Sequence, residues 1–312
     1  MEAEREALAA TLGLPSGSSI ELSVHTAITS SCRLALVRHP DGACREYVLR
    51  SYASEDELQR HVGALGALAA AGLGAAPSLA AVVGHSACEE RPDGVSAIAV
   101  PVEPDQAERV CRVLAGLHLS GLAGSGGSTS PAAGPMPGEL PLYRLGFTAE
   151  ERERAAGPTL ALQDAISDEW LGPAHGRAIS ANVVLSGSGP VLLDFASFGV
   201  SVQLFDIAAF LLSSGLPAKE RHAVAGAYGA RRGAEPSDVA DLVDAAGLLW
   251  GLEFLLALPR REIELMGEDA SLEWLRLTAR RVSLAIRDPA GDHSAARALR
   301  EALWPGIEAD DD

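Results

Sequence analysis

The sequence reads AHGRAISANVVL over residues 174–185 and GSGPVLLDF over residues 187–195. Two short β-type runs, 182–185 and 190–193, flank a Gly-Ser-Gly turn, and this pattern is typical of a β-hairpin. Polar side chains stand at the ends of the runs: His175 and Asn182 before the first, Asp194 directly after the second. Because a hairpin folds back on itself, we expect Asn182 and Asp194 to lie close together.

The side chains at this hairpin end suit a particular kind of ligand. The amide oxygen of Asn182 and the carboxylate of Asp194, completed by phosphate oxygens and water, form a candidate site for Mg²⁺, which prefers oxygen ligands. Enzymes that transfer phosphoryl groups use such residues to hold metal on nucleotide phosphates. Asp194 also ends a buried apolar strand, where a carboxylate needs a partner. The sequence therefore predicts a metal and nucleotide site here.

The first 103 residues predict a small unit of mixed α and β structure. Strand-like runs occur at 20–24, 33–38, 46–52, 77–83 and 95–102. The second and third are joined by the turn His39-Pro-Asp-Gly-Ala, in which proline presets one dihedral angle and glycine accepts a positive φ. Ser54 and Glu57 form a capping box that opens a helix, and the helix runs to about Ala71, before Gly72.

The remaining residues predict a larger, helical unit. Apolar positions repeat at the helical period after Pro104. They are Ala107, Val110, Cys111, Leu114, Leu117 and His118. Residues 121–141 are rich in Gly, Ser and Pro and are interpreted as a flexible loop. Further helices are expected at about 217–230, 236–257, 269–287 and 293–302. We therefore predict an N-lobe of residues 1–103 and a helical C-lobe of residues 104–312, which carries the hairpin at 175–195.

Six pieces of sequence occur in a recognisable order over roughly residues 18–260. They are Tyr47-Val-Leu-Arg50, the turn from Gly72 to Pro77, Leu114-Ala-Gly-Leu-His118, His175-Gly176 with Asn182, Leu192-Leu-Asp-Phe195, and Phe205-Asp-Ile-Ala208. Together they resemble the aminoglycoside phosphotransferase family, which includes choline-kinase-like and homoserine-kinase-like small-molecule kinases. The resemblance implies an α+β, bilobal protein-kinase-like fold with a small β-rich N-lobe and a larger helical C-lobe. It also implies phosphoryl transfer from ATP, or another nucleoside triphosphate, to a hydroxyl group.

The resemblance assigns roles in the C-lobe residue by residue. His175 opens the catalytic loop, and Asn182 and Asp194 would hold Mg²⁺ on the nucleotide phosphates. Asp206 would brace the loop without taking part in the chemistry.

It assigns roles in the N-lobe as well. Arg50 stands where the family usually has a phosphate-binding lysine, and Glu57 is its expected acidic partner, although the usual helix register points to His61 instead. The backbone of residues 27–31, with Thr29, Ser30 and Ser31, would lie over the phosphates. This loop contains no glycine, and Lys219 is the only lysine in the chain, so the N-lobe has no lysine to contact phosphate.

Arg177 is the main departure from the family pattern. The family has an aspartate at this place in the loop, and that aspartate accepts the proton of the substrate hydroxyl. Arginine is a permanent cation and cannot accept a proton. Loss of a positioned general base lowers rates by roughly 10² to 10⁴. A surviving reaction would need Arg177 to stabilise the transferring phosphoryl group, or another base such as Asp168 or Glu169.

The sequence leaves three functions open. The first is phosphoryl transfer to a hydroxyl of a small molecule or peptide, which the frequency of activity within the family favours slightly. The second is a pseudokinase that binds nucleotide, or a partner protein, without phosphoryl transfer. The third is a different transfer from nucleotide, such as nucleotidylation, which no residue specifically supports.

Composition narrows the class of partner. The formal net charge is −17, which argues against nucleic acid and anionic membranes because both attract basic surfaces. Four widely spaced cysteines form no C-x-x-C pair, so we expect reduced thiols and a cytoplasmic protein. No uninterrupted apolar run approaches the length of a membrane span, and the acidic start does not resemble a signal peptide.

Overall fold

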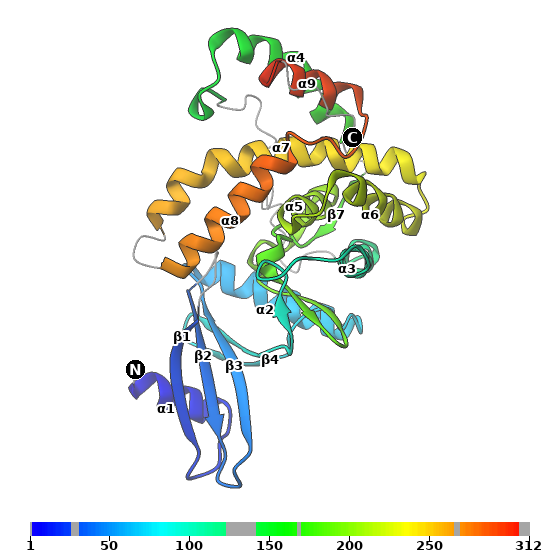
Figure 1. The fold of residues 1–312 in the computed structure, drawn as a ribbon. Helices are drawn as coiled ribbons and strands as arrows, with labels where there is room; N and C mark the ends of the chain where they lie inside the picture. The colour runs from blue at the N-terminus through cyan, green and yellow to red at the C-terminus, as the bar shows by residue number, and fades with distance from the viewer. Residues whose placement is uncertain (1, 26–30, 123–141, 167–169, 265–268, 306–312) are drawn as a thin grey trace.

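The computed structural model describes residues 2–25, 31–122, 142–166, 170–264 and 269–305. Its N-lobe contains a five-stranded antiparallel sheet in the order β1-β2-β3-β5-β4. The elements of this lobe are α1 (Glu2–Thr11), β1 (Ser19–His25), β2 (Ser31–Arg38), β3 (Cys44–Ser51), α2 (Glu55–Ala70), β4 (Leu79–Val83) and β5 (Ser86–Glu90). Figure 1 shows the sheet at the bottom and the helical lobe above it, with α2 between them.

Local sequence explains the hairpin between β2 and β3. Arg38 pairs with Cys44, as the Pro-Asp-Gly turn predicts. Gly42 has a φ of 86°, which glycine adopts without steric cost, and the Asp41 carboxylate accepts a hydrogen bond from the backbone N–H of Ala43.

The two faces of the sheet have different neighbours. One face carries a small apolar core with α1, formed by Leu8, Ala35, Val37, Tyr47, Leu49, Ala81 and Cys88. The alternate residues of β3 and β5 point to the opposite face, because side chains alternate along a strand. That face includes Arg50 and Glu89, both buried, and lies on the side of α2, where Tyr52 and Ala87 pack with Leu58.

The predicted strand at 95–102 is wrong for most of its length. Only Val95–Ser96 forms a strand, β6, and it pairs with β8 of the C-lobe hairpin instead of joining the N-lobe sheet. Ala97, Ile98 and Val102 are buried without strand pairing, so this apolar run fills core space. The fifth strand of the sheet is β5, a polar segment that the sequence patterns did not mark.

The C-lobe is mainly helical and holds the larger core. Its helices are α3 (Pro104–Leu119), α4 (Ala149–Ala165), α5 (Leu204–Ser214), α6 (Ala218–Arg231), α7 (Pro236–Glu264), α8 (Asp269–Ala285) and α9 (Ser294–Leu303). Its other strands are β7 (Leu171–Ala174), β8 (Val183–Ser186), β9 (Gly189–Leu192) and β10 (Gly199–Val202). All four predicted C-terminal helices are confirmed; α4 had no sequence prediction. Figure 1 places α4 and α9 together, farthest from the sheet.

Two features complete the C-lobe. The predicted apolar face of α3 is buried throughout, while most of the predicted loop at 121–141 lies outside the described residues. Over Pro236–Glu262, helix α7 is long and apolar enough to cross a membrane by length and composition alone, but 56% of its most apolar 18-residue stretch is buried inside the protein. Core helices of globular proteins pass the same test, and α7 packs against α5, α6 and α8.

Candidate functional site

The hairpin of β8 and β9 brings Asn182 and Asp194 together. Val183 pairs with Leu192, and the N–H of Leu193 donates to the carbonyl of Asn182 at 2.8 Å. Both polar side chains are buried, with relative exposures of 5% for Asn182 and 1% for Asp194. Asp194 has a φ of 64°, the only positive value among the described non-glycine residues. Such a backbone costs free energy and persists where its surroundings impose it, commonly at functional sites.

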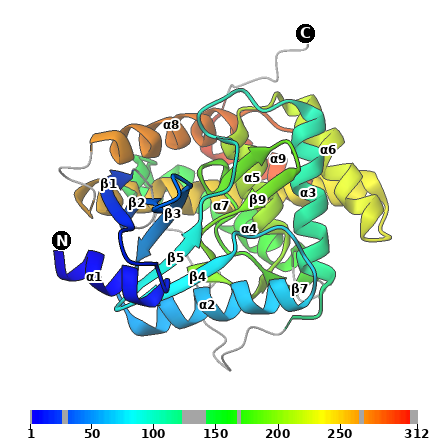
Figure 2. The ribbon, with the colours of Figure 1, turned by 90° about the horizontal axis from the view of Figure 1, so that it is seen from below.

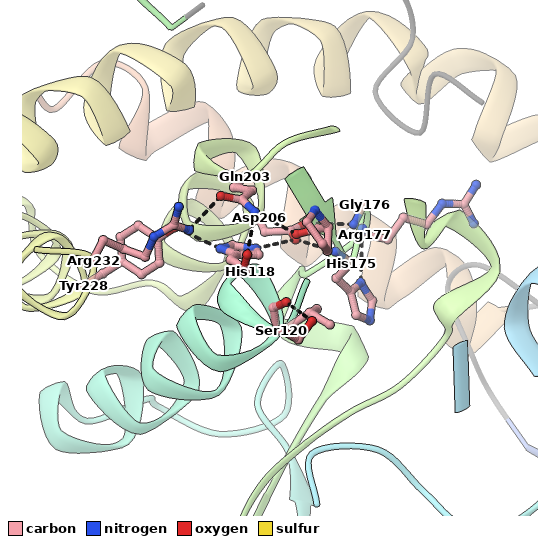
Figure 3. Close-up of polar contacts among 11 residues, drawn as sticks. His118, Ser120, His175, Gly176, Arg177, Gln203, Asp206, Tyr228 and Arg232 are labelled. Atoms are coloured by element: carbon pink, nitrogen blue, oxygen red, sulfur yellow. Dashed lines mark hydrogen bonds and ion pairs between the residues drawn. The ribbon is translucent and has the colours of Figure 1, made fainter. Parts of the chain in front are cut away.

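Asp206, at the start of α5, anchors the loop that precedes the hairpin. Its carboxylate accepts hydrogen bonds from the backbone N–H groups of His175 at 2.6 Å and Gly176 at 2.8 Å. It also accepts one from Nε2 of His118, on α3, at 3.1 Å (Figure 3). Burial alone would raise the pKa of Asp206, but the hydrogen bonds from His118 and from the backbone N–H of His175 hold that pKa below its usual value. The predicted bracing role of Asp206 is confirmed.

A second set of contacts extends this anchor into α6. Nδ1 of His118 lies 2.9 Å from the hydroxyl of Tyr228. The Arg232 guanidinium donates to that hydroxyl at 3.1 Å, and to Oε1 of Gln203 at 2.7 Å. His118 is therefore a buried histidine with a partner at each nitrogen, as Figure 3 shows. These contacts tie the loop to three helices of the C-lobe.

The backbone of Arg177 is held on both sides by side chains. Its N–H donates to Nδ1 of His175 at 3.2 Å, and its carbonyl accepts from Nδ2 of Asn182 at 3.0 Å. Nε2 of His175 in turn donates to the carbonyl of Leu193 at 2.9 Å. Burial lowers the pKa of His175, which agrees with a neutral ring that accepts at one nitrogen and donates at the other.

The Arg177 side chain leaves this network and reaches the Asp194 carboxylate. Its Nη1 atom lies 3.9 Å from Oδ2 of Asp194, and 38% of the side chain is exposed. Figure 3 shows the side chain extending away from the Asp206 contacts. A cation therefore lies on the solvent side of the buried carboxylate. Because a guanidinium is always protonated, Arg177 cannot accept a proton there.

A buried charged cluster on the N-lobe sheet faces this hairpin. Nε of Arg50 lies 3.4 Å from Oε1 of Glu89, a diagonal cross-strand neighbour on β5. His61, on α2, donates to the same oxygen at 2.9 Å through Nε2, because its Nδ1 accepts the N–H of Phe195 at 3.1 Å. Burial opposes ionisation of Glu89, but the positive charge of Arg50 and the His61 hydrogen bond keep its pKa below the usual value. The cluster thus links β3, β5 and α2 to the residue after Asp194.

Comparisons with known proteins agree with this architecture. No protein-family model and no curated protein sequence matches the chain. A structure of the macrolide 2'-phosphotransferase MphH from Brachybacterium faecium is 18% identical, with a TM-score of 0.56 over 99% of this chain and 100% of that chain. The choline kinase LicA from Streptococcus pneumoniae is 14% identical, with a TM-score of 0.58 over 91% of this chain and 98% of that one. The chain has the fold of these small-molecule kinases. The bilobal protein-kinase-like fold that the resemblance implied is confirmed.

A third structure extends the comparison. A putative fructosamine-3-kinase from Thermobifida fusca is 18% identical, with a TM-score of 0.57 over 92% of this chain and 99% of that chain. Structures of three differently named small-molecule kinases and phosphotransferases therefore match this chain over 91–99% of its length.

Within the kinase-like fold, Glu57 is not where the sequence prediction placed it. Glu57 lies in the first turn of α2 and is partly exposed. Its carboxylate accepts a hydrogen bond from the N–H of Ala53 at 3.3 Å. The N–H of Glu57 donates to Oγ of Ser54 at 3.3 Å, so the residue belongs to the predicted cap of α2. Glu89 is the carboxylate beside Arg50, and His61 is the α2 residue that reaches this cluster. The predicted pairing of Glu57 with Arg50 is corrected accordingly.

Other predicted residues lie at or beyond the edge of the described structure. Thr29 and Ser30 fall outside the described residues, as do the alternative bases Asp168 and Glu169. Ser31 is the first residue of β2, where its backbone pairs with Ser51. The phosphate-covering role of this loop stays a prediction.

Glu89 is the residue that sequence reasoning missed. Its strand reads Ser-Ala-Cys-Glu-Glu, without the β-branched and aromatic residues that mark strands. A usable signal in the sequence was Gly84, which directly follows the apolar run that forms β4. In the structure this glycine forms a turn with a φ of 57°. A hairpin at that turn returns the chain along β4 and puts Glu89 on the sheet.

The residues at the hairpin end fit Mg²⁺ by donor type and less well by charge. Asn182 donates through Nδ2 to Arg177, which leaves its amide oxygen as the available donor atom for a cation. Asp194 already has the Arg177 guanidinium at 3.9 Å, so Mg²⁺ and Arg177 compete for one carboxylate. Among the described residues, no group of three or more His, Cys, Asp or Glu side chains is placed to hold a metal ion.

Proposed function

We propose that this chain binds a nucleoside triphosphate, with ATP as the first candidate, between the Arg50 face of the N-lobe sheet and the hairpin end that carries Asp194. The frame of the site supports this proposal. Asp206 anchors the catalytic loop, His175 links it to Leu193, and the Glu89 cluster connects β3 and β5 to Phe195 through His61. Similarity to kinase structures supports a nucleotide as the ligand, and LicA is a protein solved in complex with AMP.

For the reaction, we favour nucleotide binding without efficient phosphoryl transfer, which is the pseudokinase alternative. The observation that carries this choice is the Arg177 guanidinium beside Asp194. The residue in the loop position of the proton acceptor is a fixed cation, and its backbone is held by His175 and Asn182, so it does not make room for another base at that position. The alternative function is ATP-dependent phosphoryl transfer to a hydroxyl of a small molecule or peptide. Efficient transfer would need a base at residue 177.

Mg²⁺ is proposed here only as a competitor of Arg177. Asn182 and Asp194 would hold it when the Arg177 side chain turns away, which its partial exposure permits. A bound Mg²⁺ would supply charge neutralisation for the phosphates.

Hydrolysis of ATP tests the choice between the two functions without knowledge of the acceptor. Wild type and Asp194→Ala are expected to show the same background rate, because wild type lacks the base. Arg177→Asp is expected to gain roughly 10²-fold over wild type, within the usual range for a positioned base. The measurement is phosphate release from ATP with Mg²⁺ at pH 7.5.

The control for this assay is Arg297→Asp, which makes the same change in net charge on α9, where Arg297 pairs with Asp292 on an exposed surface. It should behave as wild type. A wild-type rate well above that of Asp194→Ala would contradict the pseudokinase proposal and restore phosphoryl transfer as the function.

A further inference from the structure

The position of Arg177 is set by the loop and not by its own charge. Its N–H and C=O groups are both held by side chains, those of His175 and Asn182. The preceding residue, Gly176, is held by Asp206 and has a φ of 80°, which favours glycine. The loop would therefore present whatever side chain stands at residue 177 to the same place beside Asp194.

The proposed nucleotide site contains two ion pairs, and their formal charges cancel. Arg50 and Arg177 contribute two positive charges, while Glu89 and Asp194 contribute two negative charges. Burial works to lower the pKa of Arg50, but the negative charges around it, those of Cys32, Glu89 and Asp194, raise it, so Arg50 is also attracted to Asp194. Adding Mg²⁺ would bring two more positive charges to a carboxylate that already has a guanidinium beside it.

Whereas Mg²⁺ would be repelled by the Arg177 guanidinium, a negatively charged triphosphate would be attracted to it. Its oxygens accept hydrogen bonds, and a guanidinium offers several N–H donors in a planar arrangement that matches phosphate. Arg177 is the group placed for this role: Asp194 is 1% exposed, whereas Arg177 is 38% exposed and covers the carboxylate from the solvent side. A phosphate that approaches Asp194 meets Arg177 first.

We propose that the Arg177 guanidinium takes the place of Mg²⁺, so that this chain binds the phosphates of a nucleoside triphosphate without a divalent cation. The proposal rests on the nucleotide binding proposed above and adds the cation requirement of the same site. Asp194 then serves to orient Arg177 through their ion pair. A carboxylate at residue 177 would reverse the charge and make binding depend on metal.

Calorimetric titration of the full chain with ATP, in EDTA and in excess Mg²⁺, tests this proposal. In wild type the two dissociation constants are expected to agree within about threefold, a difference of less than the 1.4 kcal/mol that corresponds to tenfold. Arg177→Gln, which keeps hydrogen-bonding capacity and loses the charge, is expected to weaken binding in EDTA by about tenfold or more, in line with the strength of charge-assisted hydrogen bonds. Arg177→Asp is expected to bind ATP only with Mg²⁺.

Arg297→Asp is again the charge-matched control and should bind as wild type does. Melting temperatures without ligand establish that each variant is folded, and Arg177→Gln stands in if Arg177→Asp is not. Wild-type binding that requires Mg²⁺ would overturn the inference and leave nucleotide binding intact. The inference also fails if Arg177→Gln binds ATP in EDTA as tightly as wild type. No binding of ATP by wild type in either buffer would remove the proposed function itself.

Discussion

The two sides of the loop that carries His175, Gly176 and Arg177 differ in how far they depart from the expected kinase pattern. Behind the loop, Asp206 and His118 make every contact that a braced loop needs, and each of the two residues was marked by a motif in the sequence. In front of the loop, a basic residue, Arg177, stands where an acidic one was expected, and the carboxylate beside Arg50 comes from strand β5 instead of helix α2. The contacts behind the loop are retained, while the charges in front of it differ from the expected pattern.

This contrast shows what the frame is for in this chain. A braced loop with a missing base would have no purpose if proton transfer were its only task. The frame still fixes the place of residue 177, because His175 and Asn182 hold its backbone and Asp206 holds the residues before it. We infer that the rear contacts serve to position a cation at the front. The variants below test whether the two sides differ in their energetic weight as the contacts suggest.

Asp206→Ala is expected to have the largest effect on stability. It removes the acceptor of two backbone N–H groups and leaves the buried His118 ring without its carboxylate, and breaking a buried charged network costs roughly 3–5 kcal/mol. Urea unfolding, followed by circular dichroism, measures the loss. Asp292→Ala is the matched control, because its side chain is 78% exposed and pairs with Arg297 on the surface. A loss for Asp206→Ala below about 1 kcal/mol, the worth of an ordinary hydrogen bond, would contradict the bracing role.

The same variant should also change the pH dependence of stability. The folded-state pKa of Asp206 lies below its unfolded value, so its contribution is fully present above the ordinary aspartate pKa of 3.8 and is lost as the pH falls through the folded pKa. The difference in unfolding free energy between wild type and Asp206→Ala should therefore shrink as the pH is lowered below about 4. A difference that stays constant to pH 3 would show that the carboxylate charge is not what stabilises the loop.

Glu89→Gln is expected to cost less, because glutamine retains an oxygen that can accept from His61. The substitution removes one of the negative charges that compensate buried Arg50, and we expect a loss of roughly 1–3 kcal/mol, the cost of weakening a buried charged contact. Glu90→Gln, on the next and exposed residue of β5, is the control and should be nearly neutral. Urea unfolding of both variants measures the difference. Equal, small losses for the two would mean that the Arg50–Glu89 contact has no structural weight.

The sequence predicted the hairpin and the rear contacts better than the Arg50 cluster, and the reason is physical. Asn182 and Asp194 are joined by a short hairpin, and Asp206 begins a helix shortly after it, so local spacing was enough to place them. Glu89 reaches Arg50 only through pairing between β3 and β5, which lie far apart in the chain. Nothing in the composition of β5 indicated a strand, and the apolar run at 95–102 competed for that place.

Arg177 shows a second limit of the same kind. Its chemical consequence, the loss of a base, could be read from one residue and one motif. Its ion pair with Asp194 depends on the path of the loop between Gly176 and the hairpin, which no local pattern specifies. The identity of residue 177 therefore predicted that the site lacks a base, but only the fold shows that Arg177 contacts Asp194.

Glu57→Gln is expected to have the smallest effect on stability. It tests whether Glu57, the predicted partner of Arg50, matters less than Glu89, the observed one. The glutamine side chain can still accept from the N–H of Ala53, so we expect a loss below about 0.5 kcal/mol, mostly from the charge at the N-terminus of α2. Ser54→Ala, which removes the cap hydroxyl itself, should cost about 1 kcal/mol and shows that the assay resolves changes of this size. ATP affinity, measured in the same buffers as for Arg177, should be unchanged in Glu57→Gln, because its side chain caps a helix. If Glu57→Gln instead weakened ATP binding by about tenfold or more, α2 would have to move on binding so that Glu57 approaches Arg50, and the present structure would represent a conformation that precedes nucleotide binding.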